Sequence, residues 1–399
     1  MTQTLHIPGS PAVGQADHPR PFGLFKELER PGDVFRDLGP NWFASVMGTG
    51  IVANAAAVLP LRLPGLRVFA TVVWALAAAL LIALIAAWSV HWTRYPERAR
   101  GHAANPVMAQ FWGAPAMALM TVGTGTLLLG PALIGLAAAI GIDWVLWLAG
   151  TALGLVTAVW IPYLMMTRHD IGAGDAFGGW LMPVVPPMVS AATGALLIPH
   201  VGTTAFGGQG RLTLLLICYA MFGISLFASV IIITQVWSRL VTHKPGAAVM
   251  VPTLWIVLGP LGQSVTAAGN LGTAAAHVLP APYAAGAAVF ALLYGVPTWG
   301  FAMMWLALAA AITLRTARRN QPGGLPFALT WWSFTFPVGT CVTGTISLAA
   351  RSHADVLRAG SVVLFALLLA AWLVVAARTA RGAASGRLFK PMSSAAPAG

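Results

Sequence analysis

Ten stretches of about 20 mostly apolar residues recur along this 399-residue chain, and they limit its fold more than any other feature. Only 8% of the residues are charged, which is too few to cover the surface of a water-soluble domain of this length. The sequence therefore predicts an all-α integral membrane protein with ten transmembrane helices. We expect them at residues 41–60, 68–90, 106–129, 144–166, 180–199, 212–237, 248–271, 284–314, 326–349 and 359–377.

Basic residues divide unequally between the two sides of these helices. The chain has 22 Lys and Arg against 10 Asp and Glu, a net charge of +12. Loops rich in Lys and Arg stay in the cytoplasm. We therefore predict a multi-pass protein of the cell (inner or plasma) membrane with both termini cytoplasmic. The expected partner of the positive charge is the lipid bilayer, and no nucleic-acid partner is expected. The residues that fall on the opposite side are Arg62, Arg67, Arg211, Arg351 and Arg358.

From this pattern we expect the chain to consist of three parts. Residues 1–38 are expected to be a cytoplasmic N-terminal segment, partly disordered, and residues 379–399 a disordered cytoplasmic tail, because both ends are rich in small and polar residues. Residues 39–378 form the ten-helix domain. Within the first part, residues 21–38 mix Phe and Leu with charges, which fits either an interfacial segment or a solvated linker.

The odd-numbered stretches differ from the even-numbered ones because they contain Gly and Pro. They begin near residues 41, 106, 180, 250 and 327, a spacing that indicates five repeated helical hairpins. In lipid, the backbone groups that Pro and Gly free must find partners or face a cavity. We therefore predict that the odd helices line a central pore and that the even helices lie outside. The alternative is that the glycines only allow close helix packing.

The candidate pore-lining and kink residues all come from the odd stretches. Their hydroxyl and amide groups are suited to an anion path without fixed charge, although each can instead hydrogen-bond within the helix bundle. They are Ser45, Gly48, Thr49, Gly50, Gly113, Pro115, Pro186, Pro187, Gly259, Pro260, Gln263, Pro337 and Gly339.

Acidic residues are assigned to the tails, the loops and the helix ends, including Asp143 before the fourth stretch. Proton-coupled carriers and cation paths commonly use an acid within the membrane, so this distribution favours anions as cargo. A basic cytoplasmic rim would raise the local anion concentration. The sequence has no metal-ligand spacing and no nucleophile–base pair, so we predict no enzyme activity, no cofactor and no metal.

Four segments resemble a known family. They are GPNWFASVMGTGIV (39–52), WLMPVVPPMVSAATGALL (180–197), LGPLGQSVTAAGNLG (258–272) and WWSFTFPVGTCVTGT (331–345). They are similar to the tellurite-resistance/dicarboxylate transporter family, which includes the bacterial tellurite-resistance channel, yeast malate and sulfite transporters and the plant slow anion channel. The resemblance covers about residues 40–378. It implies a homotrimer with one pore in each protomer and a ninth-helix Phe that plugs the pore. Phe336 takes that position, with Phe334 as the neighbouring candidate.

The expected function is transport of small anions, such as sulfite, C4-dicarboxylates including malate, or monovalent anions, through a pore gated by this Phe. The alternative is a proton-coupled carrier or exporter for one anion, for sulfite efflux or malate transport. A tellurite or drug exporter and a membrane redox subunit fit less well, because the sequence lacks the buried acid or the intramembrane His pairs that they need.

Overall fold

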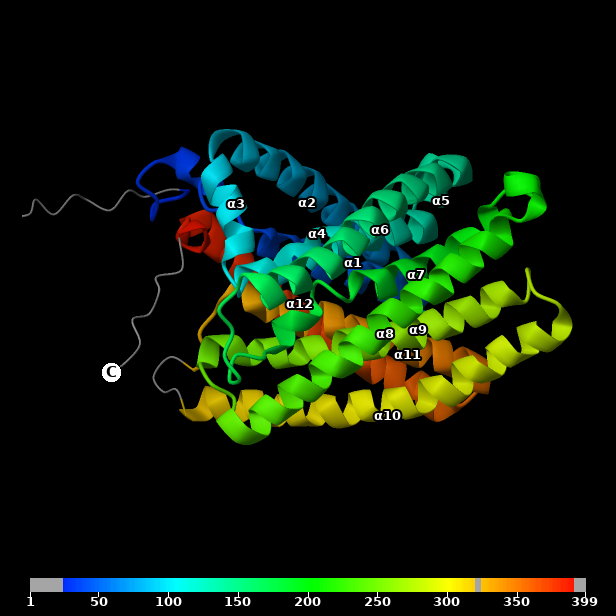
Figure 1. Cartoon of the computed structure of the whole chain (residues 1–399). Helices are drawn as coiled ribbons and strands as arrows, with labels where there is room; N and C mark the ends of the chain where they lie inside the picture. Colours follow the sequence, from blue (N-terminus) through cyan, green and yellow to red (C-terminus); the bar gives the residue numbers. More distant parts are fainter. Residues whose placement is uncertain (1–23, 320–323, 391–399) are drawn as a thin grey trace, which may run out of the picture.

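The computed structural model describes residues 24–319 and 324–390, which fold into α-helices and short 3-10 helices (Figure 1). Within this described part there is no β-strand. The α-helices are α1 (Phe43–Val58), α2 (Leu66–Arg94), α3 (Pro96–Ala104), α4 (Gly113–Leu129), α5 (Pro131–Ile134), α6 (Leu136–Thr167), α7 (Pro186–Leu197), α8 (Gly210–His243), α9 (Leu258–Ala275), α10 (Ala281–Arg319), α11 (Phe336–Ser352) and α12 (Asp355–Ser385). The 3-10 helices are η1 (Pro31–Phe35), η2 (Pro40–Trp42), η3 (Met108–Trp112), η4 (Gly178–Leu181), η5 (Ile198–His200), η6 (Ala205–Gly208), η7 (Ala248–Val257), η8 (Leu329–Phe334) and η9 (Arg387–Phe389).

The all-helical membrane fold is confirmed, with eight helical segments in the described residues long and apolar enough to cross a bilayer. Helices α1 and α7 are not among the eight. They have 16 and 12 residues, which is shorter than the roughly 20 that a crossing needs. The number of ten membrane crossings therefore stays a prediction.

The membrane-length helices form two classes by burial. In the most apolar window of the η3–α4, η7–α9 and η8–α11 segments, 72–83% of the residues are buried. In α2, α6, α8, α10 and α12 only 17–33% of the corresponding window is buried. The exposed helices carry Leu, Val and Ile on their outer faces, which suits contact with lipid chains. The first class therefore occupies the interior and the second surrounds it.

Helices α1, α4, α7, α9 and α11 contact one another in that cyclic order, with α11 returning to α1. Each also packs against an outer helix that follows it in the chain: α2, α6, α8, α10 and α12, respectively. The five inner helices are thus neighbours around a common centre, although long segments of chain separate them.

A 3-10 turn precedes each of these inner helices, and prolines stand at several of the junctions. Pro186 and Pro337 occupy the first turn of α7 and α11, where a missing N–H leaves no helical hydrogen bond unmade. These prolines therefore start helices rather than bend them. Glycines allow close contact between neighbours: a Cβ on Gly262 would lie 2.5 Å from the backbone nitrogen of Cys341 in α11.

The two described ends of the chain lie together at one end of the helix bundle (Figure 1). The backbone N–H of Phe25 donates to the carbonyl oxygen of Ala384 at 2.7 Å, and the Trp42 and Phe389 rings stack with centroids 4.6 Å apart. Helix α12 continues to Ser385, past the predicted domain boundary at residue 378. The prediction that disorder begins at residue 379 is wrong, because residues 379–385 belong to α12 and η9 (Arg387–Phe389) follows it. The rest of that predicted tail, residues 391–399, and residues 1–23 of the predicted N-terminal segment lie outside the described residues.

The prediction that every acidic residue lies outside the membrane helices or at their ends is wrong for Asp143. Helix α6 begins at Leu136 rather than near residue 144, so Asp143 lies two turns inside it. Its side chain is 1% exposed, and a Cβ on Gly123 of α4 would lie 2.5 Å from its Oδ1. Helix α6 therefore includes the apolar residues 136–142. It starts directly after Gly135, whose φ of +80° fits a turn and not a helix.

Candidate functional site

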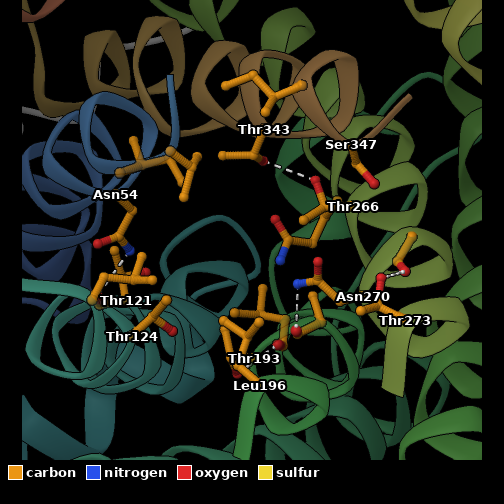
Figure 2. A pocket seen from close by; sticks show the side chains of 18 of the residues that line it. Asn54, Thr121, Thr124, Thr193, Leu196, Thr266, Asn270, Thr273, Thr343 and Ser347 are labelled. Carbon is orange, nitrogen blue, oxygen red and sulfur yellow. Dashed lines mark hydrogen bonds between the residues drawn. The ribbon is translucent and has the colours of Figure 1, made fainter. Parts of the chain in front are cut away.

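A cavity of about 390 Å³ lies between the five inner helices. Figure 2 shows side chains from these helices facing this common space. At one end the lining includes the exposed Val58, so the cavity opens to the surface there, and at the other end it is bounded by Phe336. The polar lining residues are Asn54, Thr121, Thr124, Thr193, Gln263, Thr266, Asn270, Thr273, Thr343 and Ser347, together with the charged Arg351.

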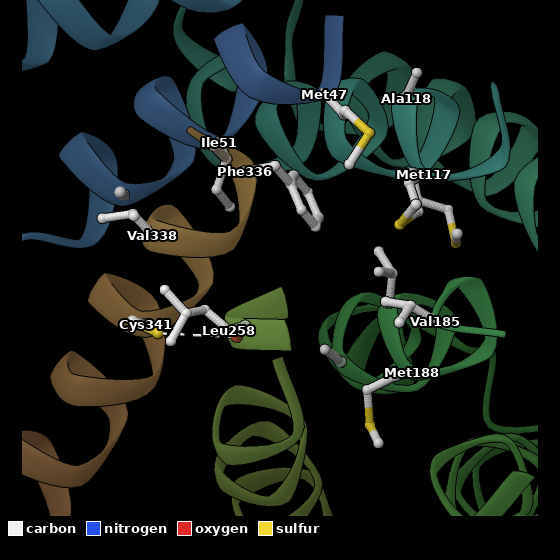
Figure 3. Close-up of a cluster of buried hydrophobic side chains, with 14 of the residues drawn as sticks. Met47, Ile51, Met117, Ala118, Val185, Met188, Leu258, Phe336, Val338 and Cys341 are labelled. Carbon is white, nitrogen blue, oxygen red and sulfur yellow. Dashed lines mark hydrogen bonds between the residues drawn. The ribbon is translucent and has the colours of Figure 1, made fainter. Parts of the chain in front are cut away.

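Phe336 also lines a second cavity of about 30 Å³ on its other side. Its side chain is 3% exposed and extends from the start of α11 toward α1, α4 and the segment before α7 (Figure 3). Neighbours such as Met47, Met117 and Val185 make the second cavity almost wholly apolar. The Phe336 ring therefore stands between a large cavity lined by both polar and apolar side chains and a small apolar one.

A third cavity of about 660 Å³ lies beyond the second, and Leu329 lines both. Its lining contains Arg98, Arg387 and Lys390, with Asp37 as the opposing charge. Arg98 forms an ion pair with Asp37. The three cavities follow one another from the open end near Val58 to this basic end, and Phe336 and Leu329 mark the divisions between them.

The sequence-predicted site residues divide between the cavities and the packing contacts. Gln263 and Phe336 line the first cavity, and Gly259, Pro260, Pro337 and again Phe336 line the second. The residues that line neither are Ser45, Gly48, Thr49, Gly50, Gly113, Pro115, Pro186, Pro187 and Gly339, all of which are buried.

The residues outside the cavities bring helices together. A Cβ on Gly48 would lie 2.3 Å from the Thr335 hydroxyl, and one on Gly339 would lie 2.4 Å from Cγ1 of Ile51. The Thr49 hydroxyl accepts a 3.2 Å hydrogen bond from Trp372 of α12. For these positions, close helix packing accounts for the small side chains.

Phe334 lies outside both cavities. Its ring packs edge-to-face against Trp255, with centroids 5.1 Å apart, and against Trp331, at 5.6 Å. Of the two candidate phenylalanines, only Phe336 lines a cavity.

Most threonine hydroxyls around the first cavity donate their protons to their own helix. Thr121, Thr124 and Thr193 each donate to the carbonyl oxygen four residues earlier, at 2.7–2.9 Å. These side chains present lone pairs to the cavity rather than protons, which reduces their ability to bind an anion. The side chains of Gln263 and Ser347 make no hydrogen bond to any described residue, so their donors are free to face the cavity.

Two features of the site were not predicted from the sequence. Arg351 was assigned to an outer loop, but it lies in the last turn of α11 and lines the first cavity. His91 and His102 place their Nε2 atoms 3.0 Å apart beside the third cavity, and burial, with the proximity of His91, lowers the pKa of His102 to about 4. The Gly and Pro pattern located the inner helices, but it indicated neither the position of Arg351 in the cavity nor the contact between His91 and His102.

Comparison with known proteins covers nearly the whole helical region. The family model described as voltage-dependent anion channel matches residues 37–380. A sulfite efflux pump from Arthroderma otae is 27% identical over 388 residues, covering 92% of this chain and 98% of the relative. A sulfite efflux pump from Trichophyton rubrum is 26% identical over 383 residues, with the same coverage. An uncharacterized transporter from Methanocaldococcus jannaschii is 26% identical, covering 88% of this chain and 96% of the relative.

Proposed function

This chain belongs to the voltage-dependent anion channel family, and we propose that it moves small anions across the membrane through the cavities on either side of Phe336. The family and the names of the relatives indicate a transporter or channel rather than an enzyme. The resemblance to the tellurite-resistance/dicarboxylate transporters agrees with this membership.

The position of Phe336 carries the proposal. Its ring lines both the cavity of about 390 Å³, where polar and apolar side chains mix, and the apolar cavity of about 30 Å³. An aromatic ring in an otherwise narrow apolar passage excludes water and therefore opposes the passage of a hydrated ion. We propose that Phe336 is the gate and that its rotation or displacement opens the path.

The charges along this route favour anions over cations. The described lining of the first cavity contains no Asp or Glu, and its charged member is Arg351. The buried Asp143 packs against Gly123 on α4 and does not line the cavity. The basic residues of the third cavity would attract anions to that entrance. The unequal distribution of Lys and Arg supports placing that end in the cytoplasm, with both termini there.

Among the candidate anions, the relatives favour sulfite, because two of them are named sulfite efflux pumps. C4-dicarboxylates such as malate, and monovalent anions, are the other candidates. A proton-coupled exporter is the second proposed mechanism, and it differs from a channel in requiring a pH gradient. The ten-crossing topology, the pore and the homotrimer remain parts of this proposal, and the mass of the detergent-solubilised protein tests the trimer.

Flux into proteoliposomes tests the gate. Wild-type protein, Phe336→Ala and Phe334→Ala are compared with sulfite, malate, chloride and nitrate, with and without a pH gradient. We expect Phe336→Ala to increase anion flux about tenfold, equivalent to a barrier lowered by about 1.4 kcal/mol. Phe334→Ala is the matched control, because Phe334 lines neither cavity. Unchanged flux in a correctly folded Phe336→Ala protein would rule out Phe336 as the gate.

A further inference from the structure

Arg351 is the charged side chain in the described lining of the first cavity, and it has no counter-ion there. None of the ion pairs among residues 24–319 and 324–390 includes it. It lies in the last turn of α11, one turn beyond Ser347 and on the same side of the helix. A half-buried cation without a counter-ion is unfavourable, because the protein interior solvates charge poorly.

Helix α9 holds the guanidinium by one of its nitrogens. The Nη2 group donates to the carbonyl oxygen of Gly269 and, at 2.7 Å, to the hydroxyl oxygen of Thr273. Gly272 lies beside the head group, and a Cβ there would be in ordinary van der Waals contact with Nη2, at 3.4 Å. The Nε–H is buried without a partner, and Nη1 makes no hydrogen bond to any residue that the structure describes. The side chain is therefore fixed in place while several of its donors stay unused.

Two further donors lie at the same end of the cavity. The hydroxyl of Ser347 makes no hydrogen bond to the described protein, and Asn270 uses one amide N–H for the carbonyl oxygen of Ala192, at 2.9 Å. Figure 2 shows Ser347 and Asn270 on the same side of the shared space. From Phe336 to Arg351 helix α11 advances about 22 Å. These donors thus stand at the entrance remote from Phe336.

We propose that Arg351, Ser347 and Asn270 form a binding site for a small oxyanion or carboxylate at this entrance. The proposal rests on the function proposed above and names a site that selects the cargo before it reaches Phe336. Both Nη2 protons of Arg351 are used by Gly269 and Thr273, so the donors left for a ligand are the Nη1 protons, the Ser347 hydroxyl and the second amide proton of Asn270. An oxyanion or a carboxylate can accept from several of these donors at once through different oxygens. Chloride offers a single spherical acceptor and gains less from that geometry, so the site favours oxyanions over halides.

The dependence of flux on anion concentration tests the site. We expect Arg351→Gln to raise the half-saturating concentration of sulfite about tenfold and that of chloride by a smaller factor. Arg351→Lys keeps the charge but loses the fixed Nη1 donors that the planar guanidinium holds in place, so it should restore chloride handling more fully than sulfite handling. The matched control is Arg358→Gln, because Arg358 carries the same charge on the same side but is paired with Asp355 outside the cavity.

Anion-dependent thermal stabilisation in detergent measures binding separately from transport. Sulfite should raise the Tm of the wild type and of Phe336→Ala, and should raise it less in Arg351→Gln and Ser347→Ala. If Arg351→Gln does not fold, Arg351→Lys and Ser347→Ala provide the same comparison. An unchanged half-saturating concentration in Arg351→Gln, or an equal change in Arg358→Gln, would overturn the site. Failure of Phe336→Ala to alter flux would reject the gate, while these binding measurements would still decide the anion site.

Discussion

Replacing Gly262 by Ala should force α9 and α11 apart, because the two helices meet at this position without an intervening side chain. An ideal Cβ there would lie 2.5 Å from both the backbone nitrogen of Cys341 and the carbonyl carbon of Thr340. Ordinary van der Waals contact begins at 3.4 Å. Neither backbone atom can rotate away as a flexible side chain does, so the helices must separate locally by about 1 Å.

The energetic cost follows from the contacts that this separation alters. The Thr340 hydroxyl also approaches the carbonyl oxygens of Leu258 and Gly259 at 3.2 and 3.3 Å, but it keeps its 2.7 Å hydrogen bond to the carbonyl oxygen of Pro337 in its own helix. The cost is therefore that of overpacking, about 1–3 kcal/mol. Alanine regains about 1 kcal/mol through its better helix propensity. The net expectation is a destabilisation of up to about 2 kcal/mol relative to the wild type, and of about 1–3 kcal/mol relative to an alanine on the same helix that makes no close contact.

Thermal unfolding of the purified protein in detergent is the assay, with Gly259→Ala as the control on the same helix. No heavy atom lies within 4 Å of a Cβ at Gly259, so alanine there should leave the Tm unchanged or raise it. We expect Gly262→Ala to unfold several degrees below both the wild type and this control. A Gly262→Ala protein as stable as Gly259→Ala would refute the close backbone contact between α9 and α11.

Two further predictions concern ionisable groups away from the main cavity. Burial lowers the pKa of His102 to about 4, from about 6.5 in an unfolded chain, so the unfolded state alone takes up a proton as the pH falls through this interval. The free energy of unfolding should therefore fall from about pH 6.5 to about pH 4, and His102→Gln should show a shallower fall in Tm; equal slopes would contradict this reasoning. Asp143→Asn removes an ionisable group whose two carboxyl oxygens are buried without a hydrogen-bond partner among the described residues. We expect an equal or higher Tm and an unchanged pH dependence of anion flux, and a marked loss of either would mean that the carboxyl acts in folding or transport.

The sequence alone determined the class of fold, because the length of an apolar segment and its lack of charge decide whether it can span a bilayer, and both are local properties of the sequence. It also separated the Gly- and Pro-containing segments, which become the buried helices, from the smooth aliphatic ones. It placed Asp143 at a helix end, because an acid after Gly141 and Ile142 looks like a boundary when only the following apolar run is counted. Helix α6 instead begins at Leu136 and includes Asp143. The Asp143 side chain is buried there against Gly123 of α4, a contact that the sequence does not reveal.

The tertiary structure decided which residues face a cavity. Glycine at 48 and glycine at 259 look alike in the sequence, yet the first packs against Trp332 and the second lines a cavity. The same holds for Phe334 and Phe336, two residues apart, of which one packs on Trp255 and the other lies between two cavities. Sequence fixes how apolar a segment is, but the direction of each side chain depends on the rotation of its helix against neighbours far away in the chain. Arg351 acquires its place beside Thr273 and Ser347 for that reason, and only the packing of α9 against α11 brings it into the cavity.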